Sequence, residues 1–227
     1  MIAQGQRSGQ VIGVCFHGIG TPGPDVESDA EPYFVSRDIF LALLDDIVQH
    51  PAVDLTFDDG YASDLDIAMP ALTERGLSAR FFPLAGRLGS RGYMDRDGVR
   101  ELASAAMTVG SHGMRHRSWR GLDATSAEEE LVVARAQLAE AAGQRVTSAA
   151  CPFGSYDRRV LAALRGHGYT QVFTSDRRRA RAGDWLQPRY SVHRGETVSS
   201  FRENILAPRP LRERVRAGAA GRVKALR

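Results

Sequence analysis

Residues 52–60, AVDLTFDDG, take the chain from a short apolar run directly into two adjacent aspartates and a glycine. Working outward, the apolar runs VIGVCF at 11–16 and ARFFPL at 79–84 flank this stretch, and each has the length and composition of a buried strand. A helix is expected at 36–49, where apolar residues recur at helical spacing, and another at 64–75, just before a glycine. Strands that alternate with helices indicate parallel β-α-β units.

The remainder of the chain continues this alternation. A capping box formed by Ser126 and Glu129 predicts the start of the clearest helix, which ends at Gly143. Further helices are expected at 97–105 and 157–166, and further strands at 107–110, 146–151, 170–175 and 189–193. The sequence therefore predicts a single-domain α/β fold, a small (β/α) barrel, with an open parallel sheet as the alternative.

The composition is that of one ordinary globular domain. With 227 residues, of which 43% are hydrophobic and 25% charged, the chain can bury a sizeable core, and wholesale disorder is excluded. No apolar run approaches the roughly 18 residues of a membrane span, and the first residues lack the apolar stretch of a secretory signal. The two cysteines, Cys15 and Cys151, do not make a disulfide scaffold. We therefore expect a cytoplasmic location.

Positive charge gathers toward the end of the chain. The formal net charge is +3, yet residues 201–227 alone hold eight basic and two acidic side chains. We divide the chain into an arm at 1–10, a catalytic domain at 11–200 and a basic tail at 201–227. One interpretation of the tail is an amphipathic helix that contacts an anionic membrane, and a docked helix or a solvated tail is the alternative. The net charge is the only feature of the sequence that would support nucleic-acid binding, and we expect no binding of nucleic acid.

Three polar clusters follow predicted strands, at 58–60, 112–116 and 151–154. In parallel α/β folds, sites form where strands end and the following loops begin. The adjacent carboxylates Asp58 and Asp59 are costly to bury unless a cation or hydrogen bonds compensate them. Because their side chains point in different directions, one could bind a metal while the other handles a proton. The alternative is a simple turn, for which Asp-Asp-Gly is suitable.

His112 and His116 are four residues apart, which places both on one face if the segment is helical. Imidazole is a common zinc ligand, and two histidines with one carboxylate leave a coordination position open for water. The alternative is a pair of surface histidines in a polar loop. Together with the aspartates at another strand end, the pair favours a metal site.

Four segments resemble, in order, the motifs of the polysaccharide deacetylase (NodB-homology) family, which is similar to carbohydrate esterase family 4. They are TFDDG at 56–60, ARFF at 79–82, GSHGMRH at 110–116 and PFGSYD at 152–157. The resemblance covers roughly residues 11–193, and the Pro-Phe-Gly variant is similar to bacterial exopolysaccharide-associated deacetylases. It implies a distorted, incomplete (β/α) barrel and a metal-dependent hydrolase.

Carried over by position, the resemblance implies that Asp59, His112 and His116 hold one divalent metal ion, for which zinc is expected. It implies that Asp58 is the general base. It also implies that the third motif forms the groove wall and contacts the substrate, and that a backbone N–H near Phe153 faces the oxyanion. The residues assigned to these contacts are Pro152, Phe153, Gly154 and Tyr156.

The sequence departs from the family pattern at two places. Ala150 stands where an arginine commonly orients the catalytic aspartate, and we expect Arg189 to support Asp58 from another strand instead. The late histidine motif that supplies the general acid is incomplete. His193 is the nearest candidate and His17, at the end of the first predicted strand, is the second, while a structural role is the alternative for each.

The function expected from these residues is N-deacetylation of an acetylated amino sugar in bacterial cell-surface or exopolysaccharide metabolism. Without an export signal, a lipid-linked or nucleotide-linked precursor fits better than a finished polymer. Two alternatives stay open: a non-catalytic carbohydrate-binding relative, and an O-acetyl esterase on the same scaffold.

Overall fold

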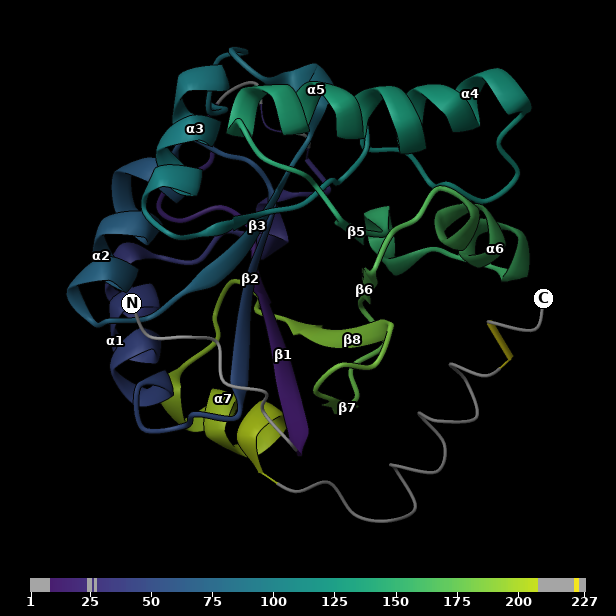
Figure 1. Ribbon diagram of the computed structural model, residues 1–227. Helices are drawn as coiled ribbons and strands as arrows, with labels where there is room; N and C mark the ends of the chain where they lie inside the picture. Colours follow the sequence, from purple (N-terminus) through teal and green to yellow (C-terminus); the bar gives the residue numbers. More distant parts are fainter. Residues whose placement is uncertain (1–8, 24–25, 27, 208–222, 225–227) are drawn as a thin grey trace.

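The structure is a computed structural model that describes residues 9–23, 26, 28–207 and 223–224. Seven parallel strands form one curved sheet in these residues, with the order β4-β3-β2-β1-β8-β6-β5 (Figure 1). Their bounds are β1 Gln10–Phe16, β2 Val53–Asp59, β3 Ala79–Pro83, β4 Thr108–Val109, β5 Ser148–Ala150, β6 Gln171–Thr174 and β8 Leu186–Ser191. The short strand β7, Ala180–Arg181, pairs with the start of β1 in the antiparallel sense.

A single bridge brings the two edges of this sheet together. Ser111, just after β4, pairs with Ala149 of β5 in the parallel sense. The Ser111 N–H donates to the Ser148 carbonyl at 3.0 Å, and the Ala150 N–H donates to the Ser111 carbonyl at 2.9 Å. The sheet is thus a nearly closed barrel with one seam, which confirms the predicted distorted (β/α) barrel.

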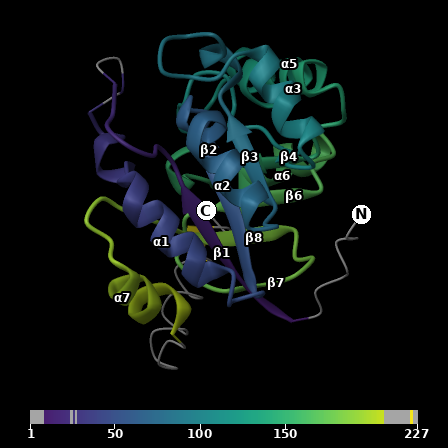
Figure 2. The ribbon, with the colours of Figure 1, turned by 90° about the vertical axis from the view of Figure 1, so that its left-hand side faces the viewer.

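Helices cover the outside of the barrel, and Figure 2 shows α7 beside α1. Their bounds are α1 Arg37–Ile47, α2 Met69–Glu74, α3 Arg96–Ser104, α4 Ala124–Glu128, α5 Ala134–Ala142, α6 Arg158–Gly166 and α7 Val198–Phe201. Three π-helical turns accompany these helices. The first leads into α2 (Asp64–Ala68), the second joins α4 to α5 (Glu129–Val133) and the third follows α7 (Arg202–Leu206). None of the helices in the described part of the chain is both long and apolar enough to cross a membrane.

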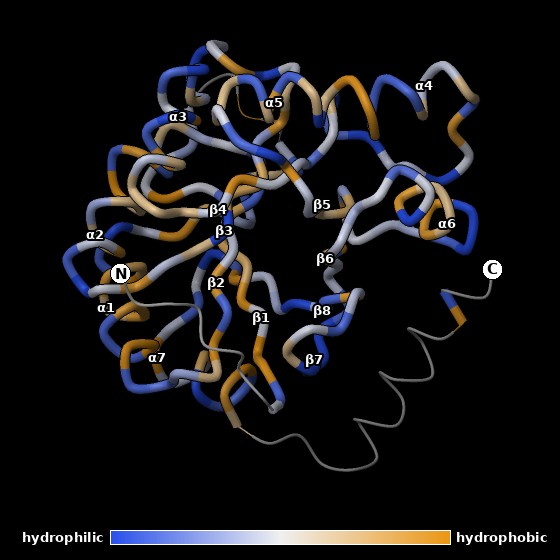
Figure 3. The backbone as a smooth tube through the Cα atoms, in the orientation of Figure 1, coloured by the Kyte–Doolittle hydropathy of each residue, from blue (hydrophilic) through white to orange (hydrophobic). Residues whose placement is uncertain are grey.

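Stacked aromatic rings connect the first three strands to α1 in the core. Phe57 of β2 packs on Phe81 of β3 with ring centroids 4.7 Å apart. Phe16 of β1 meets Phe40 of α1 edge to face at 5.2 Å. All four side chains are fully buried. Figure 3 shows hydrophobic residues interleaved with hydrophilic ones along the surrounding helices, as expected when one helix face packs on the sheet.

Two of the differences from the predicted boundaries have a clear physical cause. The helix expected to begin with a capping box at Ser126 starts earlier, because the side chain of Asp123 caps it by accepting the Ser126 N–H at 2.7 Å. The last parallel strand starts at Leu186 rather than Arg189, since Pro188 lies within it and hides its first half from the sequence pattern.

The end of the domain extends beyond residue 200. Thr197 caps α7 with a capping box, and Phe201 and Ile205 are buried in the main core cluster. The first turn of the segment interpreted as a basic tail is therefore packed on the barrel. Most of the remainder, 208–222 and 225–227, lies outside the described residues, and the prediction of a tail helix falls there.

Candidate active site

The predicted site residues come from loops at the carboxyl ends of different strands. Asp58 and Asp59 are the last two residues of β2. His112 follows β4 by three residues, and the Pro152–Gly154 turn directly follows β5 and Cys151. Parallel pairing of β2, β3 and β4, and the bridge from Ser111 to β5, bring these loops to one end of the barrel. This is the end at which barrel folds build active sites.

Asp59, His112 and His116 form one compact ligand set. The Nε2 atoms of both histidines lie 3.5 Å from Asp59 Oδ1. One ligand atom from each of the three residues lies within 4.8 Å of the other two. Asp59 Oδ1 is buried and accepts no hydrogen bond from another described residue. A carboxylate oxygen without a donor, faced by two imidazole nitrogens, fits a divalent cation, and the donor types are those that zinc takes.

The ring of His112 is oriented by the neighbouring strand. Its Nδ1 lies 2.9 Å from the Ala150 carbonyl, which assigns the proton to Nδ1 and leaves the Nε2 lone pair directed at Asp59. Burial lowers the pKa of His112 to about 4, although Asp58 and Asp59 oppose this shift. The imidazole is therefore neutral at physiological pH, which is the state that binds a metal.

Glu130 fixes the histidine loop, and sequence reasoning did not identify it. Its buried carboxylate accepts the backbone N–H of Met114 at 2.8 Å and that of Arg115 at 3.2 Å. It also accepts the indole N–H of Trp119 at 3.3 Å. Glu130 lies in the π-helical turn between α4 and α5, and only the fold brings it back to the histidine loop.

Backbone strain concentrates in the same place. Asp59 has φ 78°, His116 φ 50° and Phe153 φ 57°, which are left-handed conformations that non-glycine residues rarely adopt. Such strain persists only where the surroundings enforce it, and it is typical of functional sites.

Asp58 is held by a buried arginine from another strand. Arg189 of β8 donates from Nη1 to Asp58 Oδ1 and from Nη2 to Oδ2, both at 2.7 Å. Burial by itself would raise the pKa of Asp58, but Arg189 outweighs it and, with His112, lowers that pKa below its usual range. The side chains of Arg189 and Asp58 are 0% and 4% exposed, so this is a fully enclosed ion pair.

The structure also explains how the barrel accommodates alanine at position 150. Ala150 is fully buried and packs with Phe82 and Phe173. The Arg189 guanidinium carbon lies 5.6 Å from each of these two rings. A guanidinium thus reaches Asp58 from β8, where Arg189 was expected to act.

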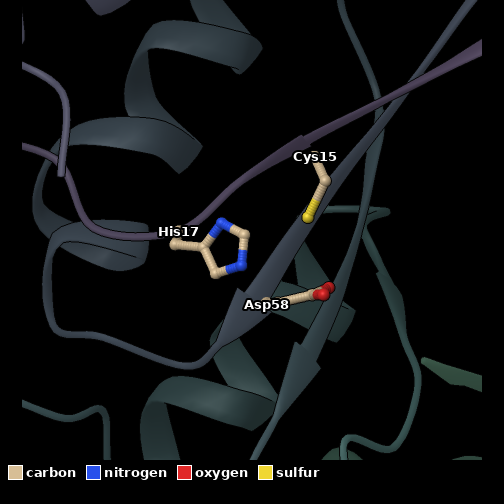
Figure 4. Close-up of side chains that lie close together, drawn as sticks. All are labelled: Cys15, His17 and Asp58. Atoms are coloured by element: carbon tan, nitrogen blue, oxygen red, sulfur yellow. The ribbon is translucent and has the colours of Figure 1, made fainter. Parts of the chain in front are cut away.

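His17 lies on another side of Asp58. Figure 4 shows Cys15 and His17, at the end of β1, facing Asp58, and the three side chains offer ligand-type atoms within 4.8 Å of one another. Arg189 already bonds both Asp58 oxygens, and its positive charge opposes a second cation here. Burial raises the pKa of the Cys15 thiol well above its ordinary value. Within this cluster, His17 has a ring nitrogen that makes no hydrogen bond, because its buried Nδ1 has no partner among the described residues.

His193 lies one ring further out. Its ring centroid is 4.6 Å from that of Tyr33, and the Tyr33 centroid is 4.7 Å from that of His17. Burial lowers the pKa of His193, and the nearby charge of Arg177 lowers it further. Burial also lowers the pKa of His17, where Asp59 and Asp58 oppose the shift. Of the two acid candidates, His17 is therefore the one beside the aspartates.

The four residues assigned to substrate contacts are placed differently from one another. Phe153 is 57% exposed, and its ring lies 4.4 Å from that of His116. Pro152 and Gly154 are buried beneath it. Tyr156 is also buried, and its hydroxyl donates to Asp176 Oδ2 at 2.7 Å. Only Phe153 of these four presents a large side chain to solvent.

Another buried carboxyl, Asp64, lies at the start of the π-helical turn after β2, and sequence reasoning did not identify it. It is fully buried, and neither oxygen has a hydrogen-bond partner among the described residues. Burial raises its pKa well above the usual value, and Asp59 and Asp58 raise it further. The protonated form of Asp64 is thus favoured, which avoids a further negative charge beside Asp58 and Asp59.

The sequence profile of the polysaccharide deacetylase family matches residues 46–172, more than half of the chain, and the chain belongs to that family. The matched region contains both aspartates, both site histidines and the Pro-Phe-Gly turn. The resemblance inferred from the sequence motifs is therefore confirmed.

Individual relatives agree with this assignment. The Bacillus subtilis protein YxkH, whose name places it in the same family, is 26% identical over 140 residues, which cover 62% of this chain and 49% of its own length. The chain thus spans about half the length of this curated relative. Streptococcus pyogenes deacetylase PplD, solved in complex with acetate, superposes with a TM-score of 0.77 at 18% identity over 88% of this chain and 100% of its own. IcaB from Ammonifex degensii gives 0.71 at 23% identity over 88% and 99%. At these identities, the two structures show a shared fold.

Proposed function

We propose that this protein is a metal-dependent hydrolase that removes the acetyl group from an N-acetylated amino sugar, in a polysaccharide or a lipid-linked or nucleotide-linked precursor. The observation that carries the proposal is the Asp59, His112 and His116 ligand set directly beside an aspartate held by a buried arginine. A divalent cation on these three residues would supply Lewis acidity and lower the pKa of a coordinated water toward neutrality.

Asp58 serves as the general base in this proposal. Each of its oxygens accepts one bond from Arg189 and keeps a second lone pair for the proton of the attacking water. Its lowered pKa keeps the carboxylate ionised at every working pH, at some cost in basicity. Arg189 fixes the direction of that lone pair, so the pair contributes positioning as well as charge.

His17 serves as the general acid, with His193 in an outer position. As water adds its oxygen to the acetyl carbon, the carbonyl becomes an oxyanion, and one water proton goes to Asp58. When the carbon–nitrogen bond breaks, His17 in its protonated form, which the charges of Asp59 and Asp58 favour against the effect of burial, gives its proton to the nitrogen, since an amide anion is too poor a leaving group. The products are acetate and the free amine. The location of His17 within 4.8 Å of Asp58 supports this assignment over His193.

The Pro152–Gly154 turn supplies the remaining contacts in this proposal. The left-handed conformation of Phe153 leaves its backbone N–H without a hydrogen-bond acceptor among the described residues, which suits a donor to the oxyanion. Its exposed ring, in contact with His116, offers an apolar face on which a sugar ring can stack.

The test is acetate release from N-acetylglucosamine oligomers by the zinc-loaded protein, with Asp58→Asn as the inactive variant. Arg96→Met, which breaks an exposed ion pair on α3, is the matched control and should keep full activity. Release that chelation abolishes would support the proposal. Release from O-acetylated but not N-acetylated sugars would favour the esterase, and sugar binding unaffected by chelation or by Asp58→Asn would favour the non-catalytic relative.

We further propose that the substrate is anionic and lies near the membrane in the cytoplasm, and that the basic segment after residue 207 binds the membrane surface there. The net positive charge of the segment supports this, because basic segments bind anionic lipid surfaces. Sedimentation with phosphatidylglycerol vesicles tests it: binding that falls steeply with salt is expected, and equal binding to phosphatidylcholine vesicles, or none, would contradict it.

A further inference from the structure

Tyr33 occupies a position between the two histidines that compete for the acid role. Its ring centroid lies 4.7 Å from that of His17 and 4.6 Å from that of His193, with similar tilts of 37° and 38°. No direct ring contact joins His17 to His193 among the described residues. Both imidazoles therefore meet the same phenol, and Tyr33 separates them.

The backbone around Tyr33 is tied to both histidine segments. On one side, the N–H of Arg194, next to His193, donates to the Pro32 carbonyl at 2.6 Å. On the other side, the N–H of Val35 donates to the carbonyl of Gly18, next to His17, at 3.1 Å. The Glu31–Tyr33 turn thus bridges the end of β1 and the loop after β8, with Tyr33 between the two anchors.

A close packing contact reinforces this bridge. A Cβ added to Gly18 would lie 2.1 Å from the ring of Phe34, so only glycine fits beneath that ring. Phe34 is buried and packs in turn on Tyr61, with centroids 4.9 Å apart. The segment that presents Tyr33 is therefore rigidly seated, whereas the His17 Nδ1 has no hydrogen-bond partner to fix its ring.

We propose that Tyr33 is a positioning residue, whose ring holds the imidazole of His17 in place beside Asp58 and keeps it apart from His193. Packing replaces the hydrogen bond that usually orients a catalytic histidine, because the buried Nδ1 has no acceptor or donor in reach. The ring, rather than the hydroxyl, performs this task. The kinetic part of its test rests on the proposed deacetylase function, and the structural part does not.

The test compares Tyr33→Phe, which keeps the ring, with Tyr33→Leu, which removes it. In the zinc-loaded protein, Tyr33→Leu should lower kcat roughly 10- to 100-fold while KM and zinc content stay near the wild type, since only the acid is misplaced. Tyr33→Phe should restore kcat to near the wild-type value. Trp185→Leu is the control, because it removes a partly buried ring at the amino end of β8, opposite the site, and should leave kcat unchanged.

A crystal structure of Tyr33→Leu gives the readout that is independent of activity. We expect the His17 ring to leave its place beside Asp58, while the His112 ring stays on the Ala150 carbonyl. Wild-type kcat in Tyr33→Leu, an unmoved His17 ring, or an equal loss in Tyr33→Phe would overturn the proposal. If the wild type released no acetate from any substrate, the proposed function would fail, and the position of His17 would still decide this inference.

Discussion

Replacing Arg189 with methionine should destabilise the protein severely, because it leaves the Asp58 carboxylate buried without its counter-ion. Arg189 is fully buried, Asp58 is 4% exposed, and two 2.7 Å bonds join them. Breaking such a buried pair by removing one partner costs about 3–5 kcal/mol. In a domain of this size each kcal/mol corresponds to roughly 2–4 °C, so the melting temperature should fall by roughly 6–20 °C.

The loss should also depend on pH. In the wild type the pKa of Asp58 is lowered, so its contribution to stability is present above the unfolded pKa of about 3.9 and is lost as the pH falls through the folded pKa. In Arg189→Met burial, the largest influence on this pKa, is opposed only by the weaker effects of His112 and His17, so the folded pKa should rise above the unfolded one. The difference in unfolding free energy between the two metal-free proteins should therefore widen from pH 4 to pH 7.

Urea unfolding, followed by tryptophan fluorescence, measures these effects, and a double-mutant cycle with Asp58→Asn separates the ion pair from the shape of the side chains. Removing both charges should recover most of the lost stability, because no uncompensated charge stays buried. The exposed pair between Arg96 and Glu140, 3.0 Å apart, provides the control, and Arg96→Met should cost less than about 1 kcal/mol. A loss below 1 kcal/mol in Arg189→Met, or simple additivity in the double variant, would refute this account.

Three further predictions follow from the same geometry. Zinc titration should give about one equivalent per chain for the wild type and for the control His50→Ala, and none for His112→Ala, whose loss removes a ligand from the set; retained zinc would contradict the ligand assignment. The thiols of Cys15 and Cys151 should resist Ellman's reagent at pH 8 in the native state and react only on unfolding. Burial raises the pKa of both thiols, that of Cys151 to about 12. Fast labelling of the native protein would disprove their burial. Phe153→Gly should lower kcat/KM at least tenfold, because the exposed ring is lost, and should leave stability unchanged or up to about 1 kcal/mol higher, because glycine relieves the left-handed backbone. Kinetics and calorimetry on one preparation check this. Full activity would show that the Phe153 ring does not contact the substrate.

The sequence was sufficient for the alternation of strands and helices because most of the parallel strands are short apolar runs. It was less informative where tertiary contacts decide. Pro188 concealed the first half of β8, and Asp123 replaced Ser126 as a helix cap because several polar residues near that helix start can serve. Tyr33 and Glu130 carried no local signal, since their importance comes from the residues that the fold places around them.

The position of Arg189 shows how far a sequence argument can extend. Alanine at position 150 indicated that Asp58 needed another cation, but the sequence could not show the space available for it. That space exists because Arg189 pairs with Gly13 of β1, where a Cβ would lie 2.9 Å from the arginine Cγ. The motif therefore showed that an arginine was missing at position 150. The arginine that takes its place, Arg189, depends on Gly13, which lies far away in the sequence.

Asp58 and Asp59 are adjacent, buried and of the same residue type, and the fold gives them different partners. Arg189 supplies one positive charge, and both of its terminal nitrogens go to Asp58. Asp59 instead faces two imidazole nitrogens and keeps an oxygen without a donor, and His112 is neutral at physiological pH. A buried carboxylate needs compensation, and among the described residues the guanidinium of Arg189 provides it for Asp58 and not for Asp59. In the proposed mechanism a bound cation supplies the charge that Asp59 lacks, so that one aspartate would act as a base and its neighbour as a metal ligand.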